Sequence, residues 1–276
     1  MAAAADIIGL WGPDALLLPA LSSISARAEM HPLARRLADR FRCIIPDWPG
    51  FGDHPREAVP LSPDTMRRFL DGFIVQNIRA SAVGIAAGHA ATYLVQAAPH
   101  HAGRFSHLVL IAPTWRGPLP TMLGETRRSL YDAIRRAIDW PIAGEALYRL
   151  NVSRPVVASM LRSHVYADAR KVTPEVIGAK LAITRHPRAR FATAAFVTGA
   201  LDPVRSRDEF LRLFEASLPP TLMLRPRNAR PQSAAEMDVL AATGRVTTVT
   251  TAGALAAHEE EPDQVARAIA GFVDAT

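Results

Sequence analysis

The stretch Gly84-Ile85-Ala86-Ala87-Gly88 decides the fold predicted for this chain, because its two glycines flank three apolar residues. This spacing matches G-x-S-x-G, a sharp turn from a strand into a helix at which the central side chain projects beyond the sheet. Glycines let backbone segments approach closely at such a turn. The central residue is Ala86, whose methyl group has no hydroxyl to attack a carbonyl. The stretch therefore predicts a strand–turn–helix unit without a nucleophile.

The same stretch allows a second register, in which the turn lies at Gly88-His89-Ala90 and the nucleophile position is Ala90. Both registers put an alanine at that position, so both exclude acyl-enzyme chemistry at this turn. In the first register His89 lies in the first turn of the following helix. Its ring then either contacts a ligand or packs beneath other segments.

Short apolar runs alternate with helical patterns on both sides of this stretch. The alternation indicates a mostly parallel sheet with helices on both faces. A final helix follows Pro262, because apolar residues recur there at helical spacing. The predicted strands are Ala15–Leu18, Arg42–Ile45, Ser81–Ile85, Leu108–Ile111, Thr221–Leu224 and Val246–Thr250.

The regular alternation stops between Thr114 and Leu218, where prolines separate several helical segments. A helical insertion of this length would cover the carboxyl ends of the strands. We therefore predict a core of residues 1–113 and 219–276 and a helical lid of residues 114–218. One run inside the insertion, Ala194–Thr198, reads instead as a possible strand.

Composition describes an ordinary globular chain of 276 residues, 49% hydrophobic and 21% charged. The single cysteine, Cys43, excludes an internal disulfide and suits a reducing cytoplasm. The first ten residues lack the basic start and long apolar run of a signal peptide. No stretch reaches the roughly 20 apolar residues that span a bilayer. We expect a cytoplasmic protein with no transmembrane segment.

The formal net charge is +6, and most arginines are dispersed along helical segments. No nucleic-acid-binding motif accompanies them, so a solvated basic surface is favoured over nucleic-acid binding. A basic face also suits an anionic ligand or a membrane surface, and the spacing does not decide between these.

Several segments together resemble the α/β-hydrolase fold family. They are LLLPALSSIS, FRCIIPDWPGFGDHPR, AVGIAAGHAA, LVLIAP and the closing HEEEPDQVARAIAGFV. The resemblance extends over essentially the whole chain and implies a mostly parallel sheet flanked by helices, with a helical lid. The phrases APTWRGPLP and QSAAEM are similar to a plant and bacterial branch of this family.

The resemblance also implies places for a catalytic histidine and acid. An acid is expected after Thr221–Leu224, yet no carboxylate follows until Glu236. Asp202 imitates the family's G-x-x-D-P phrase one element too early, so it either acts as the acid or turns a lid helix. The histidine is expected at Leu255. His258 lies three residues later and either reaches the pocket or stays at the surface.

The family's oxyanion-stabilising backbone groups correspond to Leu21 or Ser22 and to Ala87. The hydroxyl of Ser22 either lines the same mouth, serves as a replacement nucleophile or caps a helix. Trp115 and Arg116 stand at the entrance of the lid. They suit a planar or carboxylate-bearing molecule, with core packing and a surface ion pair as equal alternatives.

No cluster of ligands at metal spacing occurs, since His100 and His101 lack carboxylate partners. A phosphate loop and a dinucleotide fingerprint are also absent from the sequence. We therefore expect neither a metal nor a cofactor. The sequence predicts a protein that handles a small organic molecule under its lid by proton transfer, with His258, Asp202 and His89 as candidate groups. The alternative is a non-catalytic ligand-binding or assembly protein.

Overall fold

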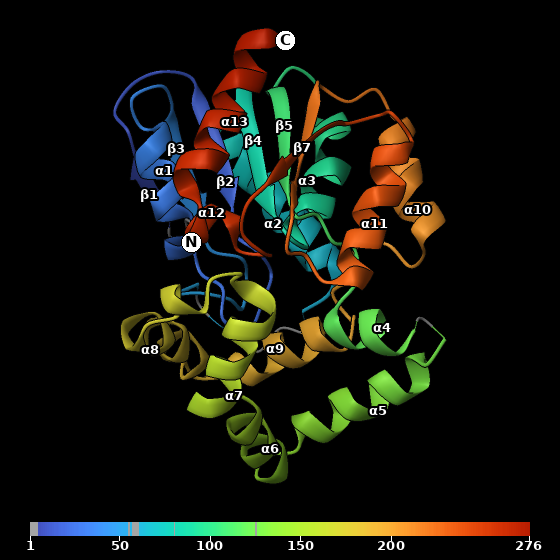
Figure 1. The fold of residues 1–276 in the computed structure, drawn as a ribbon. Coiled ribbons are helices and arrows are strands. Elements are labelled where there is room, and N and C mark those ends of the chain that lie inside the picture. Colours follow the sequence, from blue (N-terminus) through green and yellow to red (C-terminus); the bar gives the residue numbers. More distant parts are fainter. Residues whose placement is uncertain (1–4, 55, 57–60, 80, 125) are drawn as a thin grey trace.

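The computed structural model describes residues 5–54, 56, 61–79, 81–124 and 126–276. It consists of one twisted sheet between two layers of helices, with a further group of helices across one end of the sheet (Figure 1). The predicted α/β class and the mostly parallel sheet are confirmed. Among the described residues, no helix is long and apolar enough to cross a bilayer.

The sheet has seven strands in the order β1-β3-β2-β4-β5-β6-β7. Only β1 runs antiparallel to its neighbour among these strands, and it pairs with β3 at one edge. All six strands predicted from the sequence are present. β1 escaped prediction because it is a short edge strand whose side chains are only partly buried. The strands are β1 (Ala5–Ile8), β2 (Asp14–Leu18), β3 (Arg42–Pro46), β4 (Ala82–Ala87), β5 (Phe105–Ile111), β6 (Thr221–Pro226) and β7 (Thr247–Thr251).

Burial on both faces explains why the central strands read as uninterrupted apolar runs. Every residue of β2 is buried. Leu16 and Leu18 pack into the apolar cluster on one face, whereas Leu17 packs into the cluster on the other face. Gly84 in β4 is also required by packing, because a Cβ there would lie 3.1 Å from both terminal methyl groups of Leu94.

Amphipathic helices cover both faces of this sheet. The apolar stripes of α1 and α13 pack on one face, and those of α2, α3, α10 and α11 pack on the other. Each stripe repeats at three- and four-residue steps, as in Val265, Ile269 and Phe272 of α13. These helices are α1 (His31–Leu37), α2 (Pro63–Asn77), α3 (Ala90–Ala97), α10 (Arg207–Arg212), α11 (Pro231–Ala242), α12 (Ala257–Glu260) and α13 (Pro262–Ala275).

Helices α4–α9 lie together across the end of the sheet where the parallel strands finish (Figure 1). We use "lid" below for residues 118–197, which contain them. The possible strand Ala194–Thr198 is wrong, because these residues end helix α9. The helix is favoured there because alanine has the highest helix propensity, and Ala192, Ala194 and Ala195 are buried on the core side of the run. The lid helices are α4 (Pro118–Leu123), α5 (Arg128–Asp139), α6 (Ala143–Asn151), α7 (Arg154–Met160), α8 (Pro174–Thr184) and α9 (Ala189–Val197).

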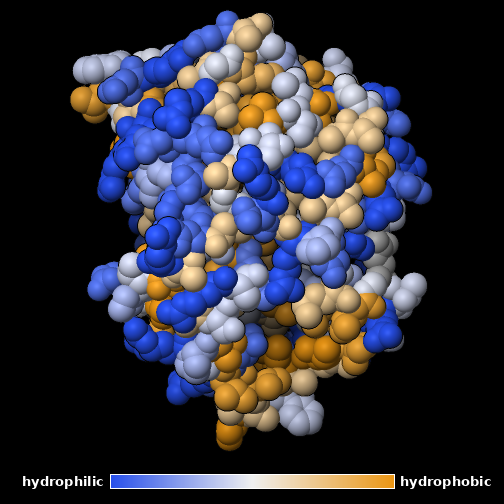
Figure 2. All heavy atoms as spheres, in the orientation of Figure 1, coloured by the Kyte–Doolittle hydropathy of each residue, from blue (hydrophilic) through white to orange (hydrophobic). Residues whose placement is uncertain are grey.

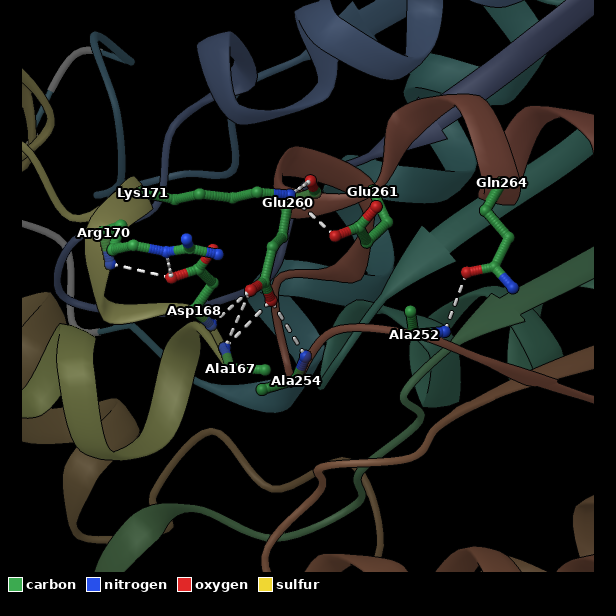
Figure 3. Close-up of polar contacts among 9 residues, drawn as sticks. All are labelled: Ala167, Asp168, Arg170, Lys171, Ala252, Ala254, Glu260, Glu261 and Gln264. Carbon is green, nitrogen blue, oxygen red and sulfur yellow. Dashed lines mark hydrogen bonds and ion pairs between the residues drawn. The ribbon is translucent and has the colours of Figure 1, made fainter.

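One buried carboxylate, that of Glu260, ties the lid to the core (Figure 3). It accepts hydrogen bonds from the lid N–H groups of Ala167 at 2.9 Å and Asp168 at 2.7 Å. It also accepts one from the core N–H of Ala254 at 3.1 Å. Beside it, the ammonium of Lys171 lies 2.6 Å from a carboxylate oxygen of Glu261. The lid segment between α7 and α8 is therefore fixed to the loop after β7.

The variant E260A tests this tether. We expect it to lower the free energy of unfolding by about 1–3 kcal/mol, because three backbone N–H groups lose their carboxylate acceptor and one of them, that of Ala254, is buried. Amide hydrogen exchange at Ala167 and Asp168 should accelerate, and E261A, which removes only a partly exposed pair, should change both quantities little. Unchanged exchange at those amides in E260A would contradict the role given to Glu260.

Candidate functional site

The sharp turn between β4 and α3 is made by Gly88. Its φ of +54° lies in the left-handed region that favours glycine. Its N–H donates to the carbonyl of Ile111 at 2.9 Å, and its own carbonyl accepts from the N–H of Thr114 at 3.1 Å. These bonds fix the turn against the end of β5. The residue that projects from the turn therefore has no side chain.

Neither register predicted from the sequence places the turn where the structure has it. Ala86 and Ala87 both lie inside β4, where they pair with Leu110 and Ile111, and Ala90 begins α3. The turn falls midway between the two predicted positions. The first glycine of the stretch misled the prediction because Gly84 serves the packing of α3 and not the turn. As a consequence, the residue after the turn is His89 and not Ala87.

The structure brings His89 and Asp202 together. The Nε2 atom of His89 lies 3.3 Å from the Oδ1 atom of Asp202 and 3.3 Å from the carbonyl oxygen of Leu201. Asp202 Oδ1 also accepts the N–H of Gly117 at 2.8 Å. Both side chains are almost fully buried. Asp202 is thus held in place from two sides, next to the turn that carries His89.

His258 lies elsewhere, in α12, and faces a carboxylate that the sequence did not suggest. Its Nε2 atom lies 3.5 Å from Oε1 of Glu29, and both side chains are 3% exposed. Neither ring nitrogen of His258 has a hydrogen-bond partner among the described residues. The surface position considered for His258 is therefore wrong. His258 pairs with Glu29, whereas Asp202 pairs with His89.

Glu29 also occupies the loop after β2 that the family resemblance associates with oxyanion stabilisation. Its Oε1 atom accepts the N–H of Ala20 at 2.7 Å. Leu21 is buried beside this loop, and the Ser22 hydroxyl lies 3.4 Å from the N–H of Ile24 in a local turn. A buried carboxylate here opposes the build-up of further negative charge.

The charge of Glu29 is balanced by the lid. The Nζ atom of Lys180, on α8, lies 3.7 Å from Glu29 and 2.7 Å from Glu259. Burial alone would raise the pKa of Glu29, but the contact with His258 and the charge of Lys180 lower it. Burial alone would lower the pKa of Lys180, but the charges of Glu259 and Glu29 raise it. The cluster is a buried ion network that joins lid and core.

The same network is the one group of side chains in the described residues with the geometry to hold a metal ion. Ligand atoms of Glu29, His258 and Glu259 lie within 4.8 Å of one another. Carboxylate oxygen and imidazole nitrogen suit zinc and similar cations. A cation bound there would have to displace the ammonium of Lys180, which already contacts Glu259. The arrangement therefore fits an internal ion network better than a metal centre.

Trp115 and Arg116 meet a second buried carboxylate, Glu236 of α11. The indole N–H of Trp115 donates to Glu236 at 3.2 Å, and Arg116 lies 2.8 Å from it. Arg207 adds two further bonds to the same carboxylate at 2.9 and 2.8 Å. The Arg116 guanidinium lies 4.8 Å from the centre of the Trp115 ring. Trp115 thus packs in the core, as one alternative predicted, whereas the ion pair of Arg116 is largely buried and not at the surface.

A cavity of about 220 Å³ opens beside this cluster, beneath the lid. Trp115, Arg116 and Asp202, three residues singled out from the sequence, all contribute to its wall. Helix α5 supplies Arg128, Tyr131 and Asp132, so the lid closes one side of it. The lining residues are Pro63, Trp115, Arg116, Pro120, Arg128, Tyr131, Asp132, Thr198, Gly199, Ala200, Asp202 and Arg205.

The variant E236Q tests the ion cluster around Glu236, which holds Arg116 at the cavity wall. Burial by itself would raise the pKa of Glu236, but hydrogen bonds from Arg207 and Trp115 and the charge of Arg116 lower it below its ordinary value of 4.5. The ionised form therefore stabilises the fold at neutral pH, and this contribution is lost as the pH falls through the lowered folded-state pKa. We expect E236Q to cost about 1–3 kcal/mol in the free energy of unfolding at pH 7.

Urea unfolding at several pH values measures this difference. The curves of E236Q and the unsubstituted protein should converge below the folded-state pKa of Glu236. The partly exposed ion pair between Asp238 of α11 and Arg225 of β6 provides the control, and D238N should cost less than about 1 kcal/mol. A penalty for E236Q that persists unchanged at acid pH would contradict the ionised role of Glu236.

Comparisons with known proteins agree with this geometry. The thermophilic esterase from Thermogutta terrifontis is 20% identical, with a TM-score of 0.73 over 98% of this chain and 92% of the esterase. The enol-lactonase from Burkholderia xenovorans is 17% identical, with a TM-score of 0.71 over 98% of this chain and 96% of the lactonase. These likenesses show the fold.

An uncharacterized protein of Mycobacterium tuberculosis is 37% identical over 67 residues. That match covers 24% of this chain and 48% of the mycobacterial protein, so the chain spans about half the length of this curated relative. The model of the "Alpha/beta hydrolase family" matches residues 15–268, nearly the whole chain. Strand order, turn and family match together lead to one conclusion: this chain belongs to the alpha/beta hydrolase family.

Proposed function

We propose that this protein binds a small organic acid in the cavity under its lid and does not hydrolyse esters through an acyl-enzyme. The observation that carries the proposal is Gly88. Its left-handed φ marks the point of the turn where a nucleophile would project, and glycine offers no atom for attack. The fold keeps the turn, and the chemistry of that turn must differ from serine hydrolysis.

The surroundings of the turn support the same proposal. Hydrolysis by acyl transfer needs N–H groups directed at a developing negative charge. In this chain the Ala20 N–H already donates to the ionised carboxylate of Glu29. The imidazole of His258 faces that carboxylate and is 2% exposed. His258 is therefore engaged in the buried ion network through Glu29.

The cavity wall supports an acidic ligand. Three arginines, Arg116, Arg128 and Arg205, line the cavity, against two aspartates, Asp132 and Asp202. Glu236 holds Arg116 in place. Arginine suits a carboxylate because its planar fork donates two parallel hydrogen bonds. Trp115 and Tyr131 add aromatic surface, so a small acid with a planar apolar body fits the wall best.

A second candidate function, proton transfer on the bound acid, is favoured by the pair His89–Asp202. Asp202 lines the cavity, and its Oδ1 atom lies 3.3 Å from the Nε2 atom of His89. Asp202 would take a proton from an acidic C–H next to a carbonyl of the ligand, leaving the electron pair on the ligand as an enolate, and His89 would orient the Asp202 side chain. Both residues were candidate groups in the sequence prediction, together with His258.

A fluorophosphonate probe tests the absence of a nucleophile. The probe forms a covalent bond with activated serine hydroxyls, so we expect no adduct by intact mass spectrometry after prolonged incubation of the folded protein. A serine esterase of the same fold serves as the positive control. If an adduct forms on any residue of the cavity or turn, and S22A removes it, the loop serine is the nucleophile and the proposal fails.

Benzoate serves as the probe for acid binding, measured by isothermal titration calorimetry. We expect R128Q to weaken benzoate about tenfold or more, because it removes a charge-assisted hydrogen bond. R267Q is the matched control, since Arg267 is exposed on α13 and outside the cavity wall. Failure of the unsubstituted protein to bind benzoate and related C4–C8 acids, or equal affinity of R128Q, would contradict the proposal.

Deuterium incorporation from D2O into phenylpyruvate separates binding from proton transfer. With proton transfer, NMR should show exchange of the C–H next to the carbonyl faster than in buffer. D202N should abolish it while retaining affinity for the acid. If the protein binds phenylpyruvate but does not accelerate the exchange, proton transfer is contradicted and only the ligand-binding function stands.

A further inference from the structure

The outer surface of the lid carries a group of exposed apolar side chains. Figure 2 shows apolar atoms gathered along the lower edge of the molecule, over the lid helices. Ile142 is 86% exposed, Leu150 69% and Trp140 66%, values unusual for large apolar residues. We call this group the lid patch, and it consists of Leu130, Trp140, Ile142, Leu147, Leu150 and Val156.

The lid patch is held together by the packing of its helices. Its residues come from α5, α6, α7 and the short turn between α5 and α6. The N–H of Gly144 donates to the carbonyl of Trp140 at 3.1 Å, which orders that turn. Tyr131 anchors the opposite side of α5 by donating to the carbonyl of Gly124 at 2.6 Å. The apolar side chains of the lid patch therefore project from an ordered surface.

The lid also carries the positive charge of the whole chain. Residues 118–197 contain 13 lysines and arginines against 6 aspartates and glutamates, whereas the remaining residues contain 19 against 20. Exposed arginines flank the patch at Arg127, Arg136 and Arg154. Arg149 beside them is paired with Glu145 at 2.8 Å. The patch thus combines apolar tips with a basic surround.

We propose that the lid patch docks on an anionic phospholipid surface. Apolar side chains with a flanking tryptophan enter the boundary between headgroups and acyl chains, and arginines around them meet the lipid phosphates. A second copy of this chain would bring two basic lids together, and their like charges would repel. Charge complementarity therefore selects an acidic surface, and the apolar tips favour a lipid one. This inference does not depend on the function proposed for the cavity.

Vesicle co-sedimentation tests the proposal, with neutral phosphatidylcholine and with about 30% phosphatidylglycerol added. We expect binding to the anionic vesicles only, and a loss of binding as NaCl rises from about 0.05 to about 0.5 M. W140S/I142S should weaken binding about tenfold or more, because both apolar tips are lost. R127Q/R136Q/R154Q should weaken it as well and flatten the dependence on salt.

The matched control is L10S/W11S, which changes two exposed apolar residues outside the lid, 85% and 69% exposed. It should bind vesicles like the unsubstituted protein. Circular dichroism establishes that each variant is folded. The proposal is overturned if the protein ignores anionic vesicles, if W140S/I142S binds as before, or if light scattering shows a dimer that W140S/I142S dissociates. The last result would make a second copy the occupant of the patch.

Discussion

The left-handed turn at Gly88 is the constraint on which the site depends. β4 must reverse into α3 within a single residue, and the hydrogen bond from Thr114 to the Gly88 carbonyl fixes the chain entering the lid against that turn. His89 follows at once and meets Asp202, which holds Gly117 at the start of α4. A single backbone position thus aligns the sheet, the first lid helix and the cavity wall.

Much of the fold could be predicted from the sequence because the central strands are buried on both faces and read as apolar runs. The position of the turn could not be predicted, because in this alanine-rich stretch either Gly84 or Gly88 could have marked it. Only packing against Leu94 reveals that the first glycine serves the sheet. The helix at Ala194–Thr198 shows the same limit, since a five-residue apolar run fits a strand or a buried helix equally well.

The candidate site was only partly predictable for a different reason. Trp115, Arg116 and Asp202 were singled out one by one, and the structure gathers them around one cavity. No sequence motif marked Glu29 or Lys180 as site residues, because a buried ion network joins residues that lie far apart in the chain. Their charges are ordinary in the sequence, and only burial makes each partner necessary. Glu236 was noted only as the first carboxylate after β6, without its contact to Arg116.

The hydrogen bonds accepted by Glu260 limit how the lid can move. They pin the lid at Ala167 and Asp168, and the Lys180 network holds α8 on the same side. On the opposite margin, α4 contacts α11, and residues of α5 line the cavity. Opening of the lid would then pivot near Ala167 and Asp168, and it would move α5 away from the core and break the bond from Arg128 to the carbonyl of Arg205. A ligand would enter along α5, which carries Arg128, Arg135 and Arg136.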